Sequence, residues 1–353
     1  MRYPEFLSEK GTIGFVAPSF GCSIEPYMTA FKNAQNKFKE MGYKLDLGPN
    51  CYELSGIGIS NAPIKCGEEF TEYYLSENND CLISCGGGEL MCEILEYVDF
   101  EAIKQAKPKW FLGYSDNTNL TFLLATLCDT ASVYGPCAAA FGMEPWHPCM
   151  KDALAVLQGR TQEIHSYGLW EKDSLKDEEH PLLPYNCTEK LELKCYLPQM
   201  LTENQVMMQV SNQASMTGRL IGGCMDCLVT LVGTKFDRVT EFLEQYKQDG
   251  FIWFLESCDL SVFDIRRAMW QMEQAGWFKY VKGFLFGRPL VHGQEMMGLN
   301  QYAAVLPVIQ RHQVPVIMDA DVGHLAPMMP LVTGSVVEMT AIDQTLKINM
   351  EYK

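Results

Sequence analysis

The chain has 353 residues, of which 47% are hydrophobic and 20% are charged, as in an ordinary globular protein. Its formal net charge of −16 disfavours binding to nucleic acid or to an anionic membrane surface, because these polyanions would repel it. No run approaches the roughly 20 apolar residues that span a bilayer. The N-terminus lacks the basic and then apolar pattern of a secretion signal. We therefore predict a cytoplasmic protein that is long enough for two domains.

Fourteen cysteines are spread along the chain without regular spacing. In a chain of this length without an export signal, reduced thiols are the simpler interpretation, and several lie among apolar residues as small buried hydrophobes. The only C-x-x-C motif is Cys224-Met225-Asp226-Cys227. It has neither a second cysteine pair nor well-placed histidines, which disfavours a zinc site, and we predict no bound metal or cofactor.

The first part of the chain alternates short apolar runs with segments of helical periodicity. The predicted strands are 11–19, 43–47, 81–85 and 109–113, and the predicted helices are 27–41, 68–75 and 116–127. Such alternation is typical of a parallel sheet with helices on both faces, so we predict a flavodoxin-like α/β domain over residues 1–165. Ligands of these sheets bind at the carboxyl ends of the strands, where the Gly86–Gly88 turn and Ser115 both fall.

The stretch from Trp146 to Cys195 is rich in proline, charge and turn residues. We interpret this whole stretch as a linker and an irregular region with short hairpin strands, and we place the inserted segment between the two domains at residues 166–195. The strands predicted after it are 214–223, 250–256, 283–287, 314–318 and 335–339, and the helices are 225–232 and 264–276. These elements predict a second, smaller and β-rich α/β domain over residues 196–353.

The segment around Ser115 is the most informative part of the sequence. A short apolar strand runs into Gly113, turns at Ser115 and opens a helix at Asp116 to Thr118. A serine at a tight strand-to-helix turn presents its hydroxyl beside the amides of the helix N-terminus, which suits a nucleophile whose oxyanion needs N–H donors. The alternative is that Ser115 only caps the helix. The G-x-S-x-G pattern of serine hydrolases is not met here.

Two further residues could complete an acyl-transfer site. Glu256 ends a nearly apolar strand, where a carboxylate is unfavourable without a partner; the alternative is that it reaches solvent at the strand end. His324 lies in a loop between two strands and could act as the base or be an ordinary surface residue. The remaining histidines lie in turns less closely bracketed by glycine and strand signals: His147, His165, His180, His292 and His312.

Seven short motifs, in order along nearly the whole chain, together resemble the LD-carboxypeptidase family of serine peptidases. They are Val16-Ala17-Pro18-Ser19, Gly86-Gly87, Gly113-Tyr114-Ser115-Asp116, Gly222-Gly223 leading to Gly233-Thr234, Phe254-Leu255-Glu256, Gly283-Phe284-Leu285-Phe286-Gly287, and Gly323-His324 followed by Pro330. No single motif is decisive, but their order is specific. The resemblance implies a metal-independent peptidase whose second domain is of the swivelling β/α type.

The resemblance also implies which residues carry the chemistry. A Ser-Glu-His triad falls on Ser115, Glu256 and His324, with the serine on the first domain and the acid and base on the second. The oxyanion hole falls on the backbone amides of Gly87 and Asp116. The resemblance further implies a homodimer and a small peptide or peptidyl-nucleotide substrate.

The glycine turn departs from the cell-wall carboxypeptidases of the family. Those enzymes often have Arg-Gly-Gly-Tyr-Gly where this chain has Cys85-Gly86-Gly87-Gly88-Glu89, so an arginine and an aromatic are missing and a carboxylate is added. The length of the chain and its aromatic-bearing insertion fit the microcin C self-immunity branch better. In that branch an insertion aromatic such as Trp170 stacks on a nucleobase, although ordinary loop packing is the simpler role for these aromatics. We predict substrate contacts from Gly86, Gly88 and Trp170.

The sequence therefore predicts a serine hydrolase that cleaves an amide bond near a free carboxyl terminus, in either a muropeptide or an aminoacyl- or peptidyl-nucleotide. Two other classes stay open. One is a ligand-binding protein on the same scaffold without catalysis. The other is a nucleotide-binding oxidoreductase, suggested by the glycine run after a strand but disfavoured because the G-x-G-x-x-G spacing is absent.

Overall fold

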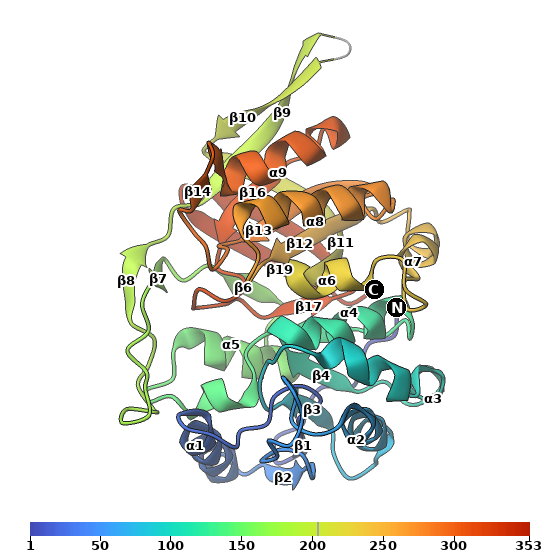
Figure 1. Ribbon diagram of the computed structural model, residues 1–353, viewed down its shortest axis with the longest axis vertical. Coiled ribbons are helices and arrows are strands. Elements are labelled where there is room, and N and C mark those ends of the chain that lie inside the picture. The colour runs from blue at the N-terminus through green and yellow to red at the C-terminus, as the bar shows by residue number, and fades with distance from the viewer. Residues whose placement is uncertain (203–204) are drawn as a thin grey trace. The chain divides into compact units, whose positions relative to one another are not determined.

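The computed structural model describes residues 1–202 and 205–353 (Figure 1). The chain divides into two compact units. Unit 1 comprises residues 1–162, 171–186 and 329–333, and unit 2 comprises residues 163–170, 187–328 and 334–353. The chain passes from one unit to the other more than once, because residues 171–186 and the late segment 329–333 both belong to unit 1.

Unit 1 is built on a six-stranded sheet in the order β17-β5-β4-β3-β1-β2. Its strands are β1 (Thr12–Val16), β2 (Lys44–Leu47), β3 (Cys81–Ser84), β4 (Trp110–Gly113), β5 (Ser132–Tyr134) and β17 (Leu331–Thr333). All neighbouring strands are parallel except β17, which pairs antiparallel with β5. The order 2-1-3-4-5 is the flavodoxin-like order, so the predicted fold class of this part is confirmed.

Helices cover both faces of this sheet. They are α1 (Tyr27–Glu40), α2 (Pro63–Leu75), α3 (Phe100–Gln105), α4 (Thr118–Thr126) and α5 (Pro148–Leu157), with short 3₁₀ helices η1 (Met91–Tyr97), η2 (Ser115–Asn117) and η3 (Ala138–Gly142). In Figure 1, α1 and α5 lie on one side of the sheet and α2, α3 and α4 on the other. Helix α1 buries Ala30, Ala34 and Phe38 at spacings of four residues, which is the apolar stripe of an amphipathic helix.

Unit 2 contains a nine-stranded mixed sheet in the order β10-β9-β16-β13-β12-β11-β18-β19-β6. Its strands are β6 (Glu163–His165), β9 (Lys194–Thr202), β10 (Gln205–Ser211), β11 (Gln213–Cys224), β12 (Phe251–Glu256), β13 (Val281–Gly287), β16 (Val316–Ala320), β18 (Val336–Ile342) and β19 (Thr345–Glu351). The four central strands β16, β13, β12 and β11 are parallel, and β9 and β18 flank them antiparallel. Their carboxyl ends therefore share one edge of the sheet.

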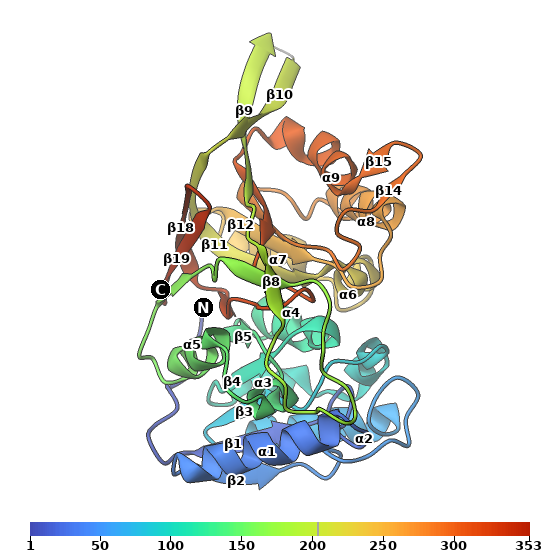
Figure 2. The ribbon, with the colours of Figure 1, turned by 90° about the vertical axis from the view of Figure 1, so that its left-hand side faces the viewer.

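The helices of unit 2 are α6 (Met225–Leu231), α7 (Val239–Gln245), α8 (Val262–Gln274) and α9 (Gln301–Ile309), followed by η4 (Gln310–His312). Figure 2 shows α6, α8 and α9 on one face of the sheet, and the β9–β10 hairpin extending beyond it. Two small two-stranded sheets pair β14 (Glu295–Met296) with β15 (Leu299–Asn300), and β7 (Leu169–Glu171) with β8 (Cys187–Lys190). Across the described ranges, the helices are too short or too polar to cross a membrane.

The proline-rich stretch after Trp146 is less irregular than its composition suggests. Pro148 occupies the first turn of α5, and the His147 side chain accepts a hydrogen bond from the Cys149 amide as its N-cap. Proline fits this position because the first helical amides have no intrahelical partner. The prediction of an irregular region is therefore wrong for these residues, because they start a helix.

Candidate active site

In unit 1, the predicted site residues lie where three neighbouring parallel strands end. Ser19 follows β1, the Gly86–Gly88 turn follows β3, and Ser115 follows β4 directly after Gly113 and Tyr114. Strands β1, β3 and β4 are adjacent in the sheet, so their carboxyl ends lie side by side. The structure thus brings the predicted nucleophile and the predicted glycine turn to one edge.

Ser115 sits in a conformation that few non-glycine residues adopt. Its φ is +62°, in the left-handed region, which costs an L-residue about 1–2 kcal/mol. Its backbone N–H donates to the Tyr134 hydroxyl at 3.3 Å. Helix α4 has Asn117, not Ser115, as its N-cap, which excludes the helix-capping role considered above. A strained serine between a strand and a helix has the form of a nucleophile elbow.

The glycine turn packs directly against this serine. A Cβ placed on Gly87 would lie 3.1 Å from the Ser115 Cβ and 3.2 Å from its Oγ, so only a glycine leaves the space around the hydroxyl open. The Asn117 side-chain amide ties the two turns together by donating to the Gly86 carbonyl at 2.8 Å and to the Tyr114 carbonyl at 3.0 Å. The sequence analysis did not single out Asn117, and no local pattern marks it.

Asp116 holds the loop after β1 through its side chain. The Ser19 hydroxyl and the Met91 amide both donate to its Oδ2, at 2.6 and 2.9 Å, and the Asn119 amide donates to Oδ1 at 3.1 Å. Burial raises the pKa of Asp116 to about 6, although these hydrogen bonds oppose the rise. The nearby Glu89 carboxylate adds to it. The Asp116 side chain is therefore structural, and the oxyanion role predicted for its backbone amide remains a prediction.

In unit 2, Glu256 and His324 form a hydrogen-bonded pair. Glu256 is the last residue of β12, and His324 lies in the loop that follows β16. The His324 Nδ1 and the Glu256 Oε2 are 2.7 Å apart. The Glu256 side chain is fully buried and that of His324 is 12% exposed. These positions exclude both the solvent-reaching glutamate and the surface histidine that the sequence left open.

Two glycines make this close pairing possible. A Cβ on Gly323, which has a φ of +104°, would lie 2.5 Å from the Glu256 Oε2. A Cβ on Gly287, at the end of β13, would lie 3.1 Å from the Glu256 Cβ and would collide with the Val322 carbonyl. The glycines of two of the family-like motifs are therefore required because the backbone passes the carboxylate at van der Waals distance.

The environment of His324 favours its protonated form. Burial lowers the pKa of the imidazole, but the Glu256 carboxylate and a hydrogen bond with the Cys258 thiol outweigh burial, so the pKa lies well above its ordinary value. A carboxylate that holds Nδ1 leaves Nε2 for proton transfer, which is the arrangement of a general base and its orienting acid.

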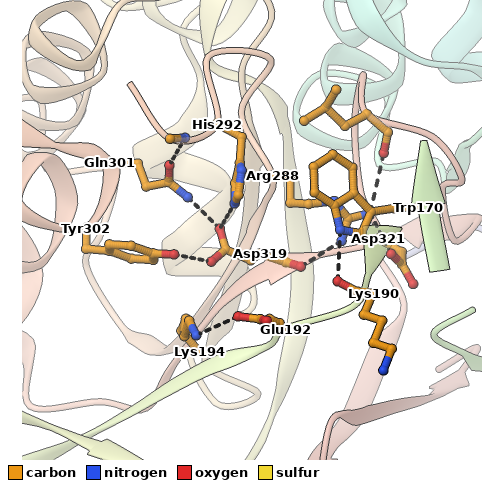
Figure 3. A network of polar contacts seen from close by, with 12 residues as sticks. Trp170, Lys190, Glu192, Lys194, Arg288, His292, Gln301, Tyr302, Asp319 and Asp321 are labelled. Atoms are coloured by element: carbon orange, nitrogen blue, oxygen red, sulfur yellow. Dashed lines mark hydrogen bonds and ion pairs between the residues drawn. The ribbon is translucent and has the colours of Figure 1, made fainter. Parts of the chain in front are cut away.

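A cavity of about 450 Å³ lies in the same unit. The residues that line it are Trp170, Thr188, Glu189, Lys190, Glu192, Lys194, Arg288, His292, Tyr302 and Asp319. Figure 3 shows the polar network at this cavity. Asp319 accepts hydrogen bonds from the Gln301 amide at 2.7 Å and the Tyr302 hydroxyl at 2.6 Å, and burial raises its pKa. The volume lies within the range of small-molecule sites.

Trp170 is held on the wall of this cavity. Its indole N–H donates to the Lys190 carbonyl at 3.0 Å, and the Arg288 guanidinium lies 4.9 Å from the ring centroid (Figure 3). The His292 ring packs edge-on to it at 5.3 Å. Trp170 is only 7% exposed. Arg288 in turn pairs with the buried Asp321 at 2.6 Å and follows Gly287 at the end of β13.

The sequence analysis passed over Arg288 and Asp319, although a signal for Arg288 was present. Like Glu256, Arg288 is a charged residue at the carboxyl end of an apolar strand, and it is 1% exposed. Among the predicted site residues, the structure pairs Ser115 with Gly87 in unit 1 and Glu256 with His324 in unit 2. Trp170 belongs to unit 2 and lines the cavity.

A strained serine turn on a doubly wound sheet, and a buried carboxylate–imidazole pair at the edge of a second sheet, are the parts used by serine hydrolases. Comparison with known proteins agrees with this class. Residues 13–135 match the LD-carboxypeptidase N-terminal domain, and residues 217–339 match the LD-carboxypeptidase C-terminal domain. The chain belongs to the LD-carboxypeptidase family, in the branch that resembles the microcin self-immunity proteins. Membership of this peptidase family implies hydrolase activity.

Among curated proteins, the chain is 24% identical over 358 residues to the microcin C7 self-immunity protein MccF of Escherichia coli, covering 98% of this chain and 95% of the relative. Among solved structures, it resembles MccF in complex with aspartyl sulfamoyl adenosine, with a TM-score of 0.80 and 21% identity over 100% of this chain and 99% of that one. It also resembles an MccF-like protein from Streptococcus pneumoniae in complex with AMP, with a TM-score of 0.75 and 20% identity over 97% and 99%. These structural likenesses confirm the fold.

Proposed function

We propose that the protein is a metal-independent serine amidase in which Ser115, His324 and Glu256 form the catalytic triad. Ser115 attacks the carbonyl carbon of the scissile amide, and His324 Nε2 accepts its proton and returns it to the leaving amine. Glu256 orients the imidazole through Nδ1 and stabilises its charged form. Water then releases the acyl group from Ser115 by the same proton route.

The observation that carries this proposal is the buried pair of Glu256 and His324. A fully buried carboxylate is unfavourable without a partner, and this one is bonded to an imidazole at 2.7 Å at the carboxyl ends of parallel strands. The strained Ser115, which lies within the residues that match the N-terminal family domain, supports the same proposal. The backbone amides of Gly87 and Asp116 are the proposed oxyanion donors.

For the substrate, we propose an aminoacyl- or peptidyl-nucleotide cleaved at its amide link. Three features support this choice: the MccF-like branch, the departure of the Cys85-Gly86-Gly87-Gly88-Glu89 turn from cell-wall carboxypeptidases, and the cavity in unit 2. Solved relatives carry aspartyl sulfamoyl adenosine and AMP. The cavity offers both cationic and acidic side chains with one aromatic wall at Trp170, which suits a zwitterionic ligand with a planar base. Gly86 and Gly88 are the proposed contacts in unit 1.

Incubation with aspartyl sulfamoyl adenosine and, separately, with a muropeptide tetrapeptide tests the proposal, with products read by mass spectrometry. Cleavage of the nucleotide compound alone is the expected result. Loss of terminal D-alanine from the tetrapeptide alone would instead make the protein a cell-wall carboxypeptidase. Binding of either compound without turnover would favour the ligand-binding alternative.

A fluorophosphonate probe separates the nucleophile from the choice of substrate. We expect wild-type protein to be labelled on Ser115, Ser115→Ala to be unlabelled, and the exposed-site control Ser174→Ala to react like wild type.

Trp170→Phe should raise KM with little change in kcat, since Trp170 is proposed to bind and not to react. The homodimer implied by the family is a separate proposal, which light scattering in solution tests.

A further inference from the structure

Cysteine thiols surround the acid–base pair of unit 2, an arrangement that neither the sequence motifs nor the proposed triad requires. Cys224 ends β11 and Glu256 ends β12, and the register pairs these two residues directly. Cys258 follows two residues after Glu256, and its thiol hydrogen-bonds the His324 imidazole. In the part of the chain that the structure describes, Cys224, Glu256 and His324 form the only group of three metal-ligating side chains whose ligand atoms all lie within 4.8 Å of one another.

We propose that Cys224, Glu256 and His324 form a binding site for a zinc ion, which inhibits the enzyme by occupying its acid–base pair. The donor set of one thiolate, one carboxylate and one imidazole is characteristic of Zn²⁺. Tetrahedral zinc with bonds of about 2.0–2.3 Å sets its ligand atoms roughly 3.3–3.8 Å apart. The atoms here must therefore approach by no more than about 1.5 Å, within the reach of small side-chain rotations.

The charges of the ligands and the hydrogen bonds that hold their segments favour binding of a zinc ion. A thiolate and a carboxylate neutralise a divalent cation, and the net charge of −16 attracts cations to the protein. The Asp226 carboxylate holds both cysteine segments: it accepts from the Cys224 thiol at 3.3 Å, from the Cys258 amide at 3.1 Å and from the Asp259 amide at 2.8 Å. When the Zn–S bond forms, the Cys224 thiol releases its proton to solvent. The Cys258 thiol, which contacts the His324 imidazole, is a candidate donor for the fourth position.

Zinc binding and catalysis exclude each other in this arrangement. The His324 Nδ1 and the Glu256 Oε2 share one proton at 2.7 Å, and a metal between them would replace that proton and widen the pair by roughly 0.6 Å. His324 would then be a ligand and no longer a base. The binding part of the proposal stands on the three side chains alone, whereas the inhibition rests on the proposed triad.

Cobalt(II) substitution tests the binding directly, without any substrate. Protein freed of metal by a chelator is titrated with Co²⁺ under a phosphine reductant, and the thiolate-to-cobalt charge-transfer band and tetrahedral d–d bands are recorded. We expect saturation at one equivalent, and bleaching when Zn²⁺ is added. Cys224→Ser should lose the charge-transfer band that Cys224 contributes and bind Zn²⁺ at least about tenfold more weakly in competition with a chromophoric chelator.

The half-exposed Cys187 provides a matched control, because it is a thiol of unit 2 outside this cluster. Cys187→Ser should give the wild-type spectrum and affinity. Thermal unfolding of each variant confirms that it is folded. A wild-type protein without a charge-transfer band, or a band that survives unchanged in Cys224→Ser, would overturn the site. Binding as expected without inhibition of hydrolysis would leave the site in place and instead contradict the role of His324.

Discussion

The two halves of the proposed site are prepared in different ways. In unit 1 the backbone conformation positions the reactive group: Ser115 is held at a φ of +62°, and Gly87 packs against it without a side chain. In unit 2 a hydrogen bond between side chains positions the reactive groups, because the buried Glu256 and His324 are held 2.7 Å apart. A nucleophile must be accessible and correctly oriented toward the substrate, and the strained backbone of the turn fixes this orientation. An acid–base pair needs fixed protonation and orientation, which burial and hydrogen bonding supply.

The largest expected effect comes from the serine. Ser115→Ala should reduce kcat by about 10⁶-fold, the scale set by nucleophile deletion in serine proteases, and leave the fold intact. Ser115→Gly should be equally inactive yet more stable than Ser115→Ala by about 1 kcal/mol, because glycine accepts a positive φ without strain. Kinetics and urea unfolding measure the two quantities. Equal stability of the two variants would show that the turn is not strained.

The second prediction tests whether Ser115 and His324 act in the same catalytic step. His324→Ala should cost nearly as much in kcat as Ser115→Ala, and Glu256→Gln should cost less, about 10⁴-fold, because the imidazole remains. The double variant Ser115→Ala/His324→Ala should be no slower than either single variant. Additive losses in kcat would mean that serine and histidine serve separate steps.

Much of this arrangement could be predicted from the sequence where the signal is local. Glycine and serine after apolar strands marked the Gly86–Gly88 turn and Ser115, and a carboxylate at the end of β12 marked Glu256. The pairing of Glu256 with His324 could not come from local pattern, because 68 residues separate them. The pairing depends on β13 lying between β12 and β16 in the sheet, an order that local spacing does not encode. Only the family resemblance placed Glu256 and His324 in one site.

The failures of the sequence analysis have physical causes as well. The sequence predicts an irregular stretch over residues 148–157 because proline and charge surround them, whereas Pro148 in fact starts α5. Segment 329–333 joins unit 1 as the antiparallel edge strand β17, a non-local pairing with β5 that no local periodicity encodes. The cavity beside Trp170 draws its walls from β8, β16 and α9, so it exists only in the folded unit.

The third prediction sharpens the role of close packing in unit 2. Gly323→Ala places a methyl group 2.5 Å from the Glu256 Oε2 and should lower kcat/KM by about a hundredfold by displacing the pair. Gly276→Ala is the matched control: its φ is also positive, at +79°, but nothing lies within 4 Å of the added carbon. Both variants should lose about 1–2 kcal/mol of stability from the backbone. Comparable activity of the two variants would remove the steric argument.

The smallest expected effect concerns a buried carboxyl group in unit 1, that of Glu69. Glu69, in α2, is 3% exposed and accepts hydrogen bonds from the Ala17 amide at 3.0 Å and the Asn50 amide at 2.9 Å, so it braces the loop after β1. Burial raises its pKa to about 7, whereas Glu256 is held against a cationic partner. The serine half should therefore respond to pH in its stability, independently of catalysis.

The direction of that response follows from proton binding. Because folded Glu69 holds its proton up to about pH 7 and the unfolded chain releases it near pH 4.5, the folded state loses stability as pH rises between these values. The loss reaches at most about 3 kcal/mol and is complete above pH 7. Urea unfolding at pH 5 and pH 8 should show this loss in full in wild type and in the exposed control Glu77→Gln. The loss should be clearly smaller in Glu69→Gln but not absent, because the raised pKa values of Asp116 and His324 act in the same direction. Parallel changes in all three proteins would place the pH sensitivity elsewhere and leave the backbone of the serine half independent of Glu69.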